Sequence, residues 1–209
     1  MPVVNLNLDR FKEMLGTEIS QDLIIEKLPY LGLDIEDISN SDMRIEYNPN
    51  RLDYSSDYGI ARGLKGLLDI DLGCPTYNVS NGSVEVIVDP SVQRIRPYIV
   101  SAIIKNLNLT TESIKQIISM QEDIHNSIGR RRRKVSIGIH NLDVITPPIT
   151  YTAKPSDFKF QPLDENKEMS IDEINKETKV GQSYSYIVDG HGIYPILLDD
   201  NQQVLSFPP

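Results

Sequence analysis

Short apolar segments separated by polar turns run through the first 80 residues, and their spacing changes from element to element. Segments of strand length predict strands over residues 3–6, 34–38 and 43–47. Apolar positions at helical spacing predict a helix over residues 9–15, closed by Gly16, and a second over residues 20–28, which Ser20 can cap. This mixture indicates a small α+β domain.

A third helix follows residue 55 and carries the clearest apolar face of this part. Ser55 or Ser56 can cap its first turn, because a serine hydroxyl accepts from the unpaired amides there. Turn-forming residues at 73–75 and 81–82 then predict a domain boundary near residue 80. The apolar stripe of this helix consists of Ile60, Ala61, Leu64, Leu67 and Leu68.

Beyond the boundary, alternating valines over residues 84–88 predict a strand. Residues 98–104 are apolar on both faces, as in a strand buried inside a sheet. Residues 135–140 alternate again, and Gly138 would leave space for another group to approach one face. An irregular stretch containing several prolines follows, and a short helix is predicted over residues 170–179.

A long helix is predicted from Thr110 or Thr111 to residue 128, where Gly129 ends it. Gln121 falls within its apolar stripe, and a buried amide must find hydrogen-bond partners. The other members of this stripe are Ile114, Ile117, Ile118, Ile124 and Ile128.

Residues 194–198 and 203–207 flank four polar residues and predict a β-hairpin. With an even-numbered loop, Leu197 pairs with Val204, so that Leu197 and Ser206 share one face of the ribbon. The chain stops directly after a strand, which leads us to expect that the domain continues beyond residue 209.

The formal net charge of −9 argues against a protein whose whole surface binds nucleic acid. Five consecutive cations nevertheless stand in this acidic chain: Arg130, Arg131, Arg132, Arg133 and Lys134. Any RNA contact would be local, and the sign of these charges suits a phosphate or carboxylate partner. From charge alone, a solvated turn between a helix and a strand is the favoured interpretation, because blocks of charge are common on surfaces.

Residue types and spacing argue against several kinds of chemistry. The single cysteine, Cys74, allows neither an internal disulfide nor a thiolate zinc cluster. The three histidines have no ligand spacing, so no metal site is expected, and no glycine-rich loop is present for ATP. Neither a membrane span nor a signal peptide is recognisable, which makes the cytosol the default location.

Two groups of side chains could bind a ligand. Ser206 lacks the turn and the base of a catalytic nucleophile, and fits better as a hydroxyl that lines a pocket. Gln121 and Glu122, with Arg132 just beyond the helix, could together bind a ribose, a phosphate or an amino-acid head group. A salt bridge at the helix end fits that pattern equally well.

Several motifs follow one another along nearly the whole chain. They are Asn48-Pro49-Asn50-Arg51-Leu52-Asp53, Tyr58-Gly59-Ile60-Ala61-Arg62, and residues 95–98, 121–140 and 204–209. The first two resemble the Asn-Arg-x-Asp…Gly-x-Ala-Arg block of phenylalanyl-tRNA synthetase β subunits. The others resemble the entry, the body and a pocket strand of the tRNA-editing domain of that family, in its archaeal and eukaryotic form.

This resemblance implies an α+β fold class. A small amino-terminal α+β domain over residues 1–80 would precede a mixed-sheet α/β editing domain over residues 81–209, truncated at its carboxyl end. The family is a cytoplasmic ligase of two α and two β subunits that joins phenylalanine to tRNA(Phe) with ATP and magnesium. Activation takes place on the α subunit, so no cofactor is expected in this region.

The resemblance also implies proofreading. A site built for phenylalanine cannot fully reject a ring that adds a hydroxyl, so mischarged tyrosyl-tRNA(Phe) is hydrolysed in a second pocket. By motif position, Leu197 and Ser206 line that pocket, and Gln121, Glu122 and Arg132 lie near it. The candidates for RNA contact are Arg130, Arg131, Arg133 and Lys134.

The family's pocket also uses an Asn, an Asp and a Thr that follow this tail. We therefore expect the isolated chain to hydrolyse mischarged tRNA weakly or not at all, and we expect the ligase active site to be absent. A non-catalytic RNA-binding or subunit-docking module is the main alternative. A stand-alone deacylase is a further one, which the early end of the chain disfavours.

Overall fold

The computed structural model describes residues 2–209, which form two compact units. The first unit consists of residues 2–78 and 108–128, and the second of residues 79–107 and 129–209. Each unit has a hydrophobic core of its own. Residues 108–128 therefore belong to the first unit, although they follow residue 80 in the chain. The predicted domain boundary near residue 80 stays a prediction.

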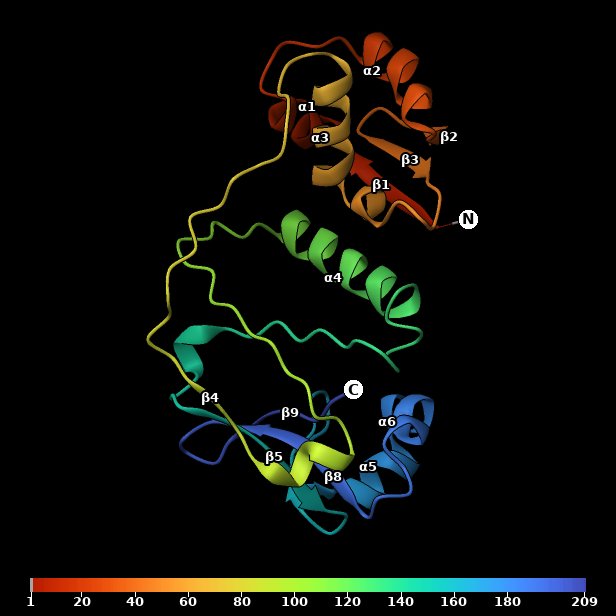
Figure 1. Ribbon diagram of the computed structural model, residues 1–209. Coiled ribbons are helices and arrows are strands. Elements are labelled where there is room, and N and C mark those ends of the chain that lie inside the picture. The colour runs from red at the N-terminus through yellow and green to blue at the C-terminus, as the bar shows by residue number, and fades with distance from the viewer. Residues whose placement is uncertain (1) are drawn as a thin grey trace. The chain divides into compact units, whose positions relative to one another are not determined.

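The first unit contains an antiparallel sheet (Figure 1). β3 (Asp42–Glu46) lies between β1 (Val3–Asn7) and β2 (Asp34–Ile38). These strands confirm the predicted ones to within one residue at each end. The helical elements of the unit are α1 (Leu8–Leu15), α2 (Gln21–Lys27), η1 (Leu28–Leu31), η2 (Leu52–Ser55), α3 (Asp57–Leu67) and α4 (Thr111–Asn126).

Side-chain caps fix where these helices begin. Asn7, Ser20 and Ser56 each accept a hydrogen bond from the backbone amide three residues further on, at 3.1, 3.2 and 3.2 Å. Thr110 and Ser113 cap α4 reciprocally. The sequence predicted each of these caps except Asn7, and it left Ser55 and Thr111 open as alternatives.

The core of the first unit joins the sheet to the helices. Leu6 of β1, Ile45 of β3 and Phe11 of α1 are fully buried in it. Of the predicted stripe on α3, Ile60 is fully buried whereas Leu67 is 40% exposed. The buried face of this helix is therefore narrower than the sequence predicted.

Helix α4 departs most from its predicted burial. Its buried residues are Gln116 and His125, whereas Ile114 and Ile118 are 44% and 55% exposed and Ile128, just beyond the helix, is 61% exposed. The predicted apolar stripe is therefore wrong as the buried face of α4. Hydrogen bonds to the first unit, described below, turn the polar side of this helix inward.

A mixed sheet of order β4-β5-β8-β9 forms the base of the second unit (Figure 1). β4 (Val86–Val88) runs parallel to β5 (Ile149–Pro155), and β5, β8 (Ile193–Leu198) and β9 (Val204–Ser206) are antiparallel neighbours. The predicted α+β class with a mixed second sheet is confirmed. The unit also contains β6 (Lys159–Phe160), β7 (Met169–Ser170), α5 (Ile171–Glu177), α6 (Lys179–Tyr184), η3 (Pro90–Arg94), η4 (Leu142–Val144) and η5 (Ser185–Ile187).

Aromatic side chains hold the last residues of the chain against the core of the second unit. The ring of Phe207 stands edge-on to the rings of Phe160 and Tyr194, with centroids 6.2 and 6.1 Å away. Ile196 of β8 and Ile171 of α5 are fully buried in the same core. The β8–β9 ribbon is therefore anchored on one face, and the other face, called the open face below, carries the partly exposed Leu197 and Ser206.

Three expectations about the second unit are wrong. Irregular structure was expected after residue 140, but β5 is an inner strand of the sheet. The prolines near β5 do not interrupt the strand, because they lie before it and at its end. Residues 98–104 and 135–140 are not strands, and neither segment has a hydrogen-bonded strand neighbour among residues 2–209. Tyr98, Val100 and Ile104 are accordingly 90%, 97% and 72% exposed.

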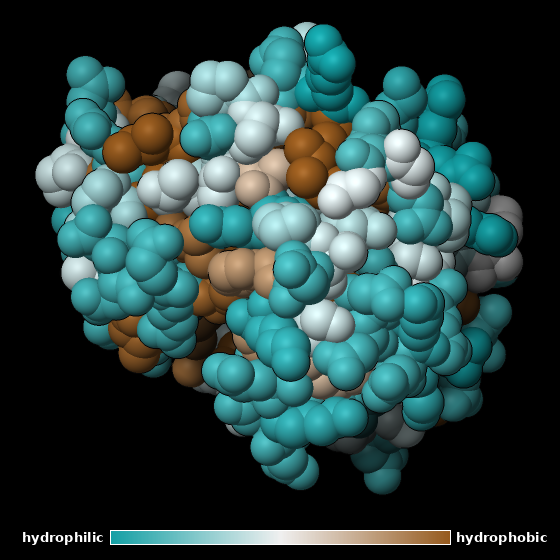
Figure 2. All heavy atoms as spheres, turned by 90° about the horizontal axis from the view of Figure 1, so that it is seen from below, coloured by the Kyte–Doolittle hydropathy of each residue, from teal (hydrophilic) through white to brown (hydrophobic). Residues whose placement is uncertain are grey.

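The face of the molecule drawn in Figure 2 is mostly hydrophilic, with hydrophobic residues showing between the polar side chains in separate patches. None of the helices in residues 2–209 combines the length and the apolar character that crossing a bilayer requires.

Candidate functional site

Leu197 and Ser206 lie directly opposite each other in the antiparallel β8–β9 ribbon. Ile196 and Leu198, on either side of Leu197, are buried in the core, whereas Leu197 and Ser206 are partly exposed. The two residues therefore share one face of the ribbon, as the hairpin predicted. Their role as pocket residues stays a prediction.

The register of this ribbon differs from the predicted one. Leu198 pairs with Val204 and Leu197 pairs with Ser206, so Leu205 is an additional residue in β9. The predicted pairing of Leu197 with Val204 is wrong. Because of this bulge, Val204 packs against the core while Ser206, only two residues later, pairs on the open face.

Asp199 organises the turn that joins the two strands. Its buried carboxylate accepts hydrogen bonds from the amide of Gln203 at 2.9 Å and from the amide of Thr146 at 3.2 Å. The amide of Asp200 donates to the carbonyl of Thr146 at 2.8 Å. The turn is therefore fastened to the segment that leads into β5, which holds this end of the β8–β9 ribbon in the sheet.

The predicted cationic run forms a tight turn in an unusual backbone conformation. Arg130, Arg131 and Arg132 have φ angles of 49°, 54° and 63°, in the left-handed region. This conformation costs roughly 1–2 kcal/mol per residue when the side chain is not glycine. The amide of Lys134 closes the turn by donating to the carbonyl of Gly129 at 2.9 Å.

Aromatic rings lie under two of these arginines. The guanidinium of Arg132 stands 4.3 Å from the ring centre of Tyr184, and that of Arg133 stands 5.0 Å from the ring centre of Tyr186. Such contacts stabilise a cation by roughly 0.5–2 kcal/mol, depending on burial. They fasten the cationic turn to α6 and η5.

Arg96 connects the cationic turn to the central sheet. Its Nη2 donates to the carbonyl of Arg132 at 2.9 Å, and its own carbonyl accepts from the hydroxyl of Tyr151 on β5 at 2.7 Å. Burial lowers the pKa of the Arg96 guanidinium and raises the pKa of Tyr151. Arg96 belongs to the predicted domain-entry motif, and its observed part is to hold this turn.

The remaining predicted residues lie on α4 in the first unit. Gln121 is half-buried, and Glu122 is within 3.2 Å of the Nδ1 atom of His125. Gln121 and Glu122 belong to the first unit, and Arg132 belongs to the second. The grouping of Gln121 and Glu122 with Arg132 near one pocket stays a prediction.

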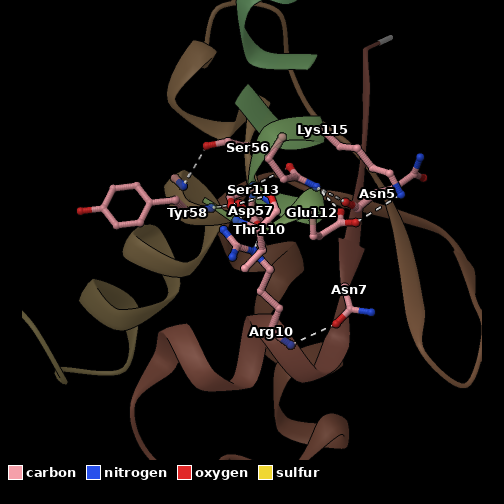
Figure 3. A network of polar contacts seen from close by, with 12 residues as sticks. Asn5, Asn7, Arg10, Ser56, Asp57, Tyr58, Thr110, Glu112, Ser113 and Lys115 are labelled. Atoms are coloured by element: carbon pink, nitrogen blue, oxygen red, sulfur yellow. Dashed lines mark hydrogen bonds and ion pairs between the residues drawn. The ribbon is translucent and has the colours of Figure 1, made fainter. Parts of the chain in front are cut away.

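The amide that is buried in α4 is Gln116, which the sequence analysis did not select. Its Nε2 donates to the carbonyl of Asn5 at 2.8 Å, and its Oε1 accepts from the amide of Asp57 at 3.3 Å. Asp57, itself buried, accepts from Nε of Arg10 at 2.7 Å (Figure 3). Gln116 lies outside the apolar stripe, so helical periodicity gives no sign of its burial.

The family motif around residues 48–62 has a structural part in the first unit. Arg51 forms an ion pair with Asp53 at 2.7 Å, and its guanidinium lies 3.8 Å from the ring centre of Tyr54. Gly59 lets the first turn of α3 lie close to the preceding loop, because a Cβ atom on residue 59 would lie 1.5 Å from the carbonyl oxygen of Asp53. The motif therefore fixes how the loop before α3 meets the start of that helix.

Comparison with known proteins bears on the origin of these motifs. No protein-family model matches the chain. The chain is 39% identical over 209 residues to the phenylalanine–tRNA ligase β subunit of Archaeoglobus fulgidus and 43% identical over 211 residues to that of Methanothrix thermoacetophila. These alignments cover 100% of this chain but only 38% and 39% of the two relatives.

A crystal structure shares the fold as well. An N-terminal fragment of the phenylalanyl-tRNA synthetase β subunit from Pyrococcus horikoshii matches with a TM-score of 0.93 at 35% identity, covering 100% of this chain and 61% of that one. Fold and motifs therefore define part of an aminoacyl-tRNA synthetase subunit. More particularly, the chain is related over its whole length to the amino-terminal part of archaeal phenylalanyl-tRNA synthetase β subunits, which confirms the predicted family. It spans about two fifths of the length of the curated relatives it matches.

Proposed function

We propose that this chain serves within a phenylalanine–tRNA ligase and that its second unit contributes to a pocket that hydrolyses tyrosyl-tRNA(Phe). The observation that carries this proposal is the cross-strand pair of Leu197 and Ser206 on the open face of the β8–β9 ribbon. An apolar side chain and a hydroxyl group are thereby presented side by side on a rigid element.

This pair suits the discrimination that proofreading requires. The aromatic ring of a bound tyrosine would pack against Leu197, and its hydroxyl would exchange a hydrogen bond with the hydroxyl of Ser206. A phenylalanyl group would leave the Ser206 hydroxyl unmatched, and a desolvated polar group without a partner is costly. Ser206 acts here as a specificity residue and not as a nucleophile.

The rest of the enzyme enters the proposal through the family. An α subunit would be the partner in an assembly of two α and two β subunits, and it would carry the ATP- and magnesium-dependent joining of phenylalanine to tRNA(Phe) in the cytoplasm. The resemblance assigns further pocket side chains to positions after residue 209. We therefore propose that the isolated chain hydrolyses mischarged tRNA slowly or not at all.

The experiment compares tyrosyl-tRNA(Phe) hydrolysis by a whole α–β assembly that contains this region, with Ser206 intact and with Ser206→Ala. We expect hydrolysis to fall about tenfold in the variant, the effect of one hydrogen bond to a desolvated partner. Phenylalanine attachment should not change. Ser101→Ala is the matched control, because Ser101 is exposed in the same unit.

Two results would contradict the proposal at different points. Equal hydrolysis by the Ser206→Ala and unaltered assemblies would remove Ser206 from the pocket. Absence of hydrolysis from the unaltered assembly, with RNA binding retained, would favour the second candidate function. That candidate is a non-catalytic RNA-binding or subunit-docking module, which the exposed cations of the second unit support.

A further inference from the structure

The cationic turn offers several positive charges that the protein itself does not neutralise. Within residues 2–209, Arg130, Arg131 and Lys134 are exposed and form no ion pair. The chain as a whole carries 30 acidic and 21 basic residues, so unpaired neighbouring cations are unexpected in it. Charge complementarity therefore indicates an anionic partner at this turn.

The turn is preorganised for such a partner. Its left-handed backbone is held from one side by the hydrogen bond from Arg96 to the carbonyl of Arg132. It is held from another side by the stacking of Arg132 on Tyr184. A ligand would therefore meet cations whose backbone is already fixed, which reduces the entropy lost on binding.

An exposed aromatic ring lies beside these cations. Tyr186 has 45% of its surface exposed, and the guanidinium of Arg133 stands 5.0 Å from its ring centre. An aromatic ring and an arginine plane next to backbone-tracking cations form the usual platform for single-stranded nucleic acid. In such platforms, the phosphates of the nucleic acid bind the cations while an unpaired base stacks on the aromatic ring.

We propose that Tyr186 and Arg133 stack an unpaired base of a single-stranded RNA end, while Arg130, Arg131 and Lys134 bind the adjoining phosphates. The inference deepens the proposed function, since the RNA end is that of the tRNA on which the second unit acts. An acidic peptide would use the cations but has no need of the ring. Duplex RNA keeps its bases paired and presents no free face to the ring.

The experiment measures binding of this 209-residue chain to a short single-stranded RNA ending in CCA, by fluorescence anisotropy at several salt concentrations. We expect Tyr186→Ala to weaken binding about tenfold and Tyr186→Phe to bind like the unaltered chain, because a phenyl ring also stacks. Arg131→Gln should reduce the slope of log K against log salt by about 0.7. Tyr77→Ala and Lys105→Gln, at exposed positions, are the matched controls and should change nothing.

A series of oligonucleotides, each with one base replaced by an abasic nucleotide, makes the test specific. At one position, loss of the base should weaken binding by the unaltered chain about tenfold and by Tyr186→Ala hardly at all, because both changes remove the same stack. Equal losses with both proteins at every position would overturn the proposal, as would equal binding by Tyr186→Ala and the unaltered chain. Because the readout is binding, its outcome is independent of whether the Ser206→Ala assembly loses hydrolysis.

Discussion

Leu197 and Ser206 are cross-strand partners because one additional residue, Leu205, enters β9 between Val204 and Ser206. The bulge lets Val204 fill the core while Ser206 pairs on the open face. A partly exposed side chain and one that packs against the core can thus follow each other closely. The bulge is therefore the local feature that places Ser206 opposite Leu197.

The turn before β9 should depend on Asp199. We expect Asp199→Ala to destabilise the ribbon by about 1–3 kcal/mol, because the amides of Gln203 and Thr146 lose a carboxylate acceptor. Amide hydrogen exchange at Gln203 measures this directly. Asp200→Ala, at an exposed neighbouring position, should leave exchange unchanged, and equal exchange in both variants would contradict this account.

Two glycines of α3 should respond in opposite directions to alanine. Gly59→Ala should lower the free energy of unfolding of the first unit by at least ~3 kcal/mol, because its Cβ would collide with the Asp53 carbonyl. Gly66→Ala should raise it by about 1 kcal/mol, since the nearest atom lies 3.9 Å away and alanine favours helix. Urea unfolding of both variants checks the signs, and a stable Gly59→Ala protein would show that the loop before α3 can move aside.

The docking of α4 should depend on Gln116. Gln116→Ala leaves the amide of Asp57 and the carbonyl of Asn5 without these partners, which should cost about 2–4 kcal/mol. Lys115→Ala removes a neighbouring side chain that is 69% exposed and should have little effect. Hydrogen exchange across α4 distinguishes the two, because undocking of the helix would raise exchange only in the first variant.

The first unit should lose stability in alkaline solution through Tyr47. Burial, and then the 2.7 Å hydrogen bond to Asp123, raise the pKa of this tyrosine. The folded protein therefore favours the neutral phenol. Its contribution is present below the ordinary tyrosine value of about 10 and is lost as the pH rises from there through the raised pKa.

Tyr47→Phe tests this dependence. The variant should be less stable at neutral pH by about 1.5–3 kcal/mol, but its stability should fall less steeply above pH ~10. Tyr58→Phe, at a position 57% exposed, should keep the steep fall. Urea unfolding at a series of alkaline pH values measures the slopes, and identical slopes for the Tyr47→Phe and unaltered proteins would refute the assignment.

Local signals predicted the first unit well. The caps at Ser20 and Ser56 and the turn glycine Gly16, with φ 71°, depend on residues within a few positions, which the sequence displays. The same holds for the strands of its sheet. Burial on α4 could not be predicted, because whether Gln116 or Ile118 faces inward depends on groups more than 50 residues away.

Long-range pairing also limits what could be predicted of the second unit. β5 forms a strand because β4 and β8 pair with it on both sides. Its own proline-flanked sequence does not show these partners. Residues 98–104 have the composition of a buried strand but no strand partner within residues 2–209. At the site, alternation placed Leu197 and Ser206 on one face, whereas the bulge that pairs them has no sequence signature.

The hydrogen bond from Gln116 to Asn5 also bears on the order in which the protein can fold during synthesis. The two residues are 111 positions apart, so residues 2–78 leave the ribosome long before α4 exists. Until then, the amide of Asp57 and the carbonyl of Asn5 must remain hydrated or find temporary partners. The first unit is consequently finished only after residues 79–107, which belong to the other unit, have been made, and its last folding step waits on translation.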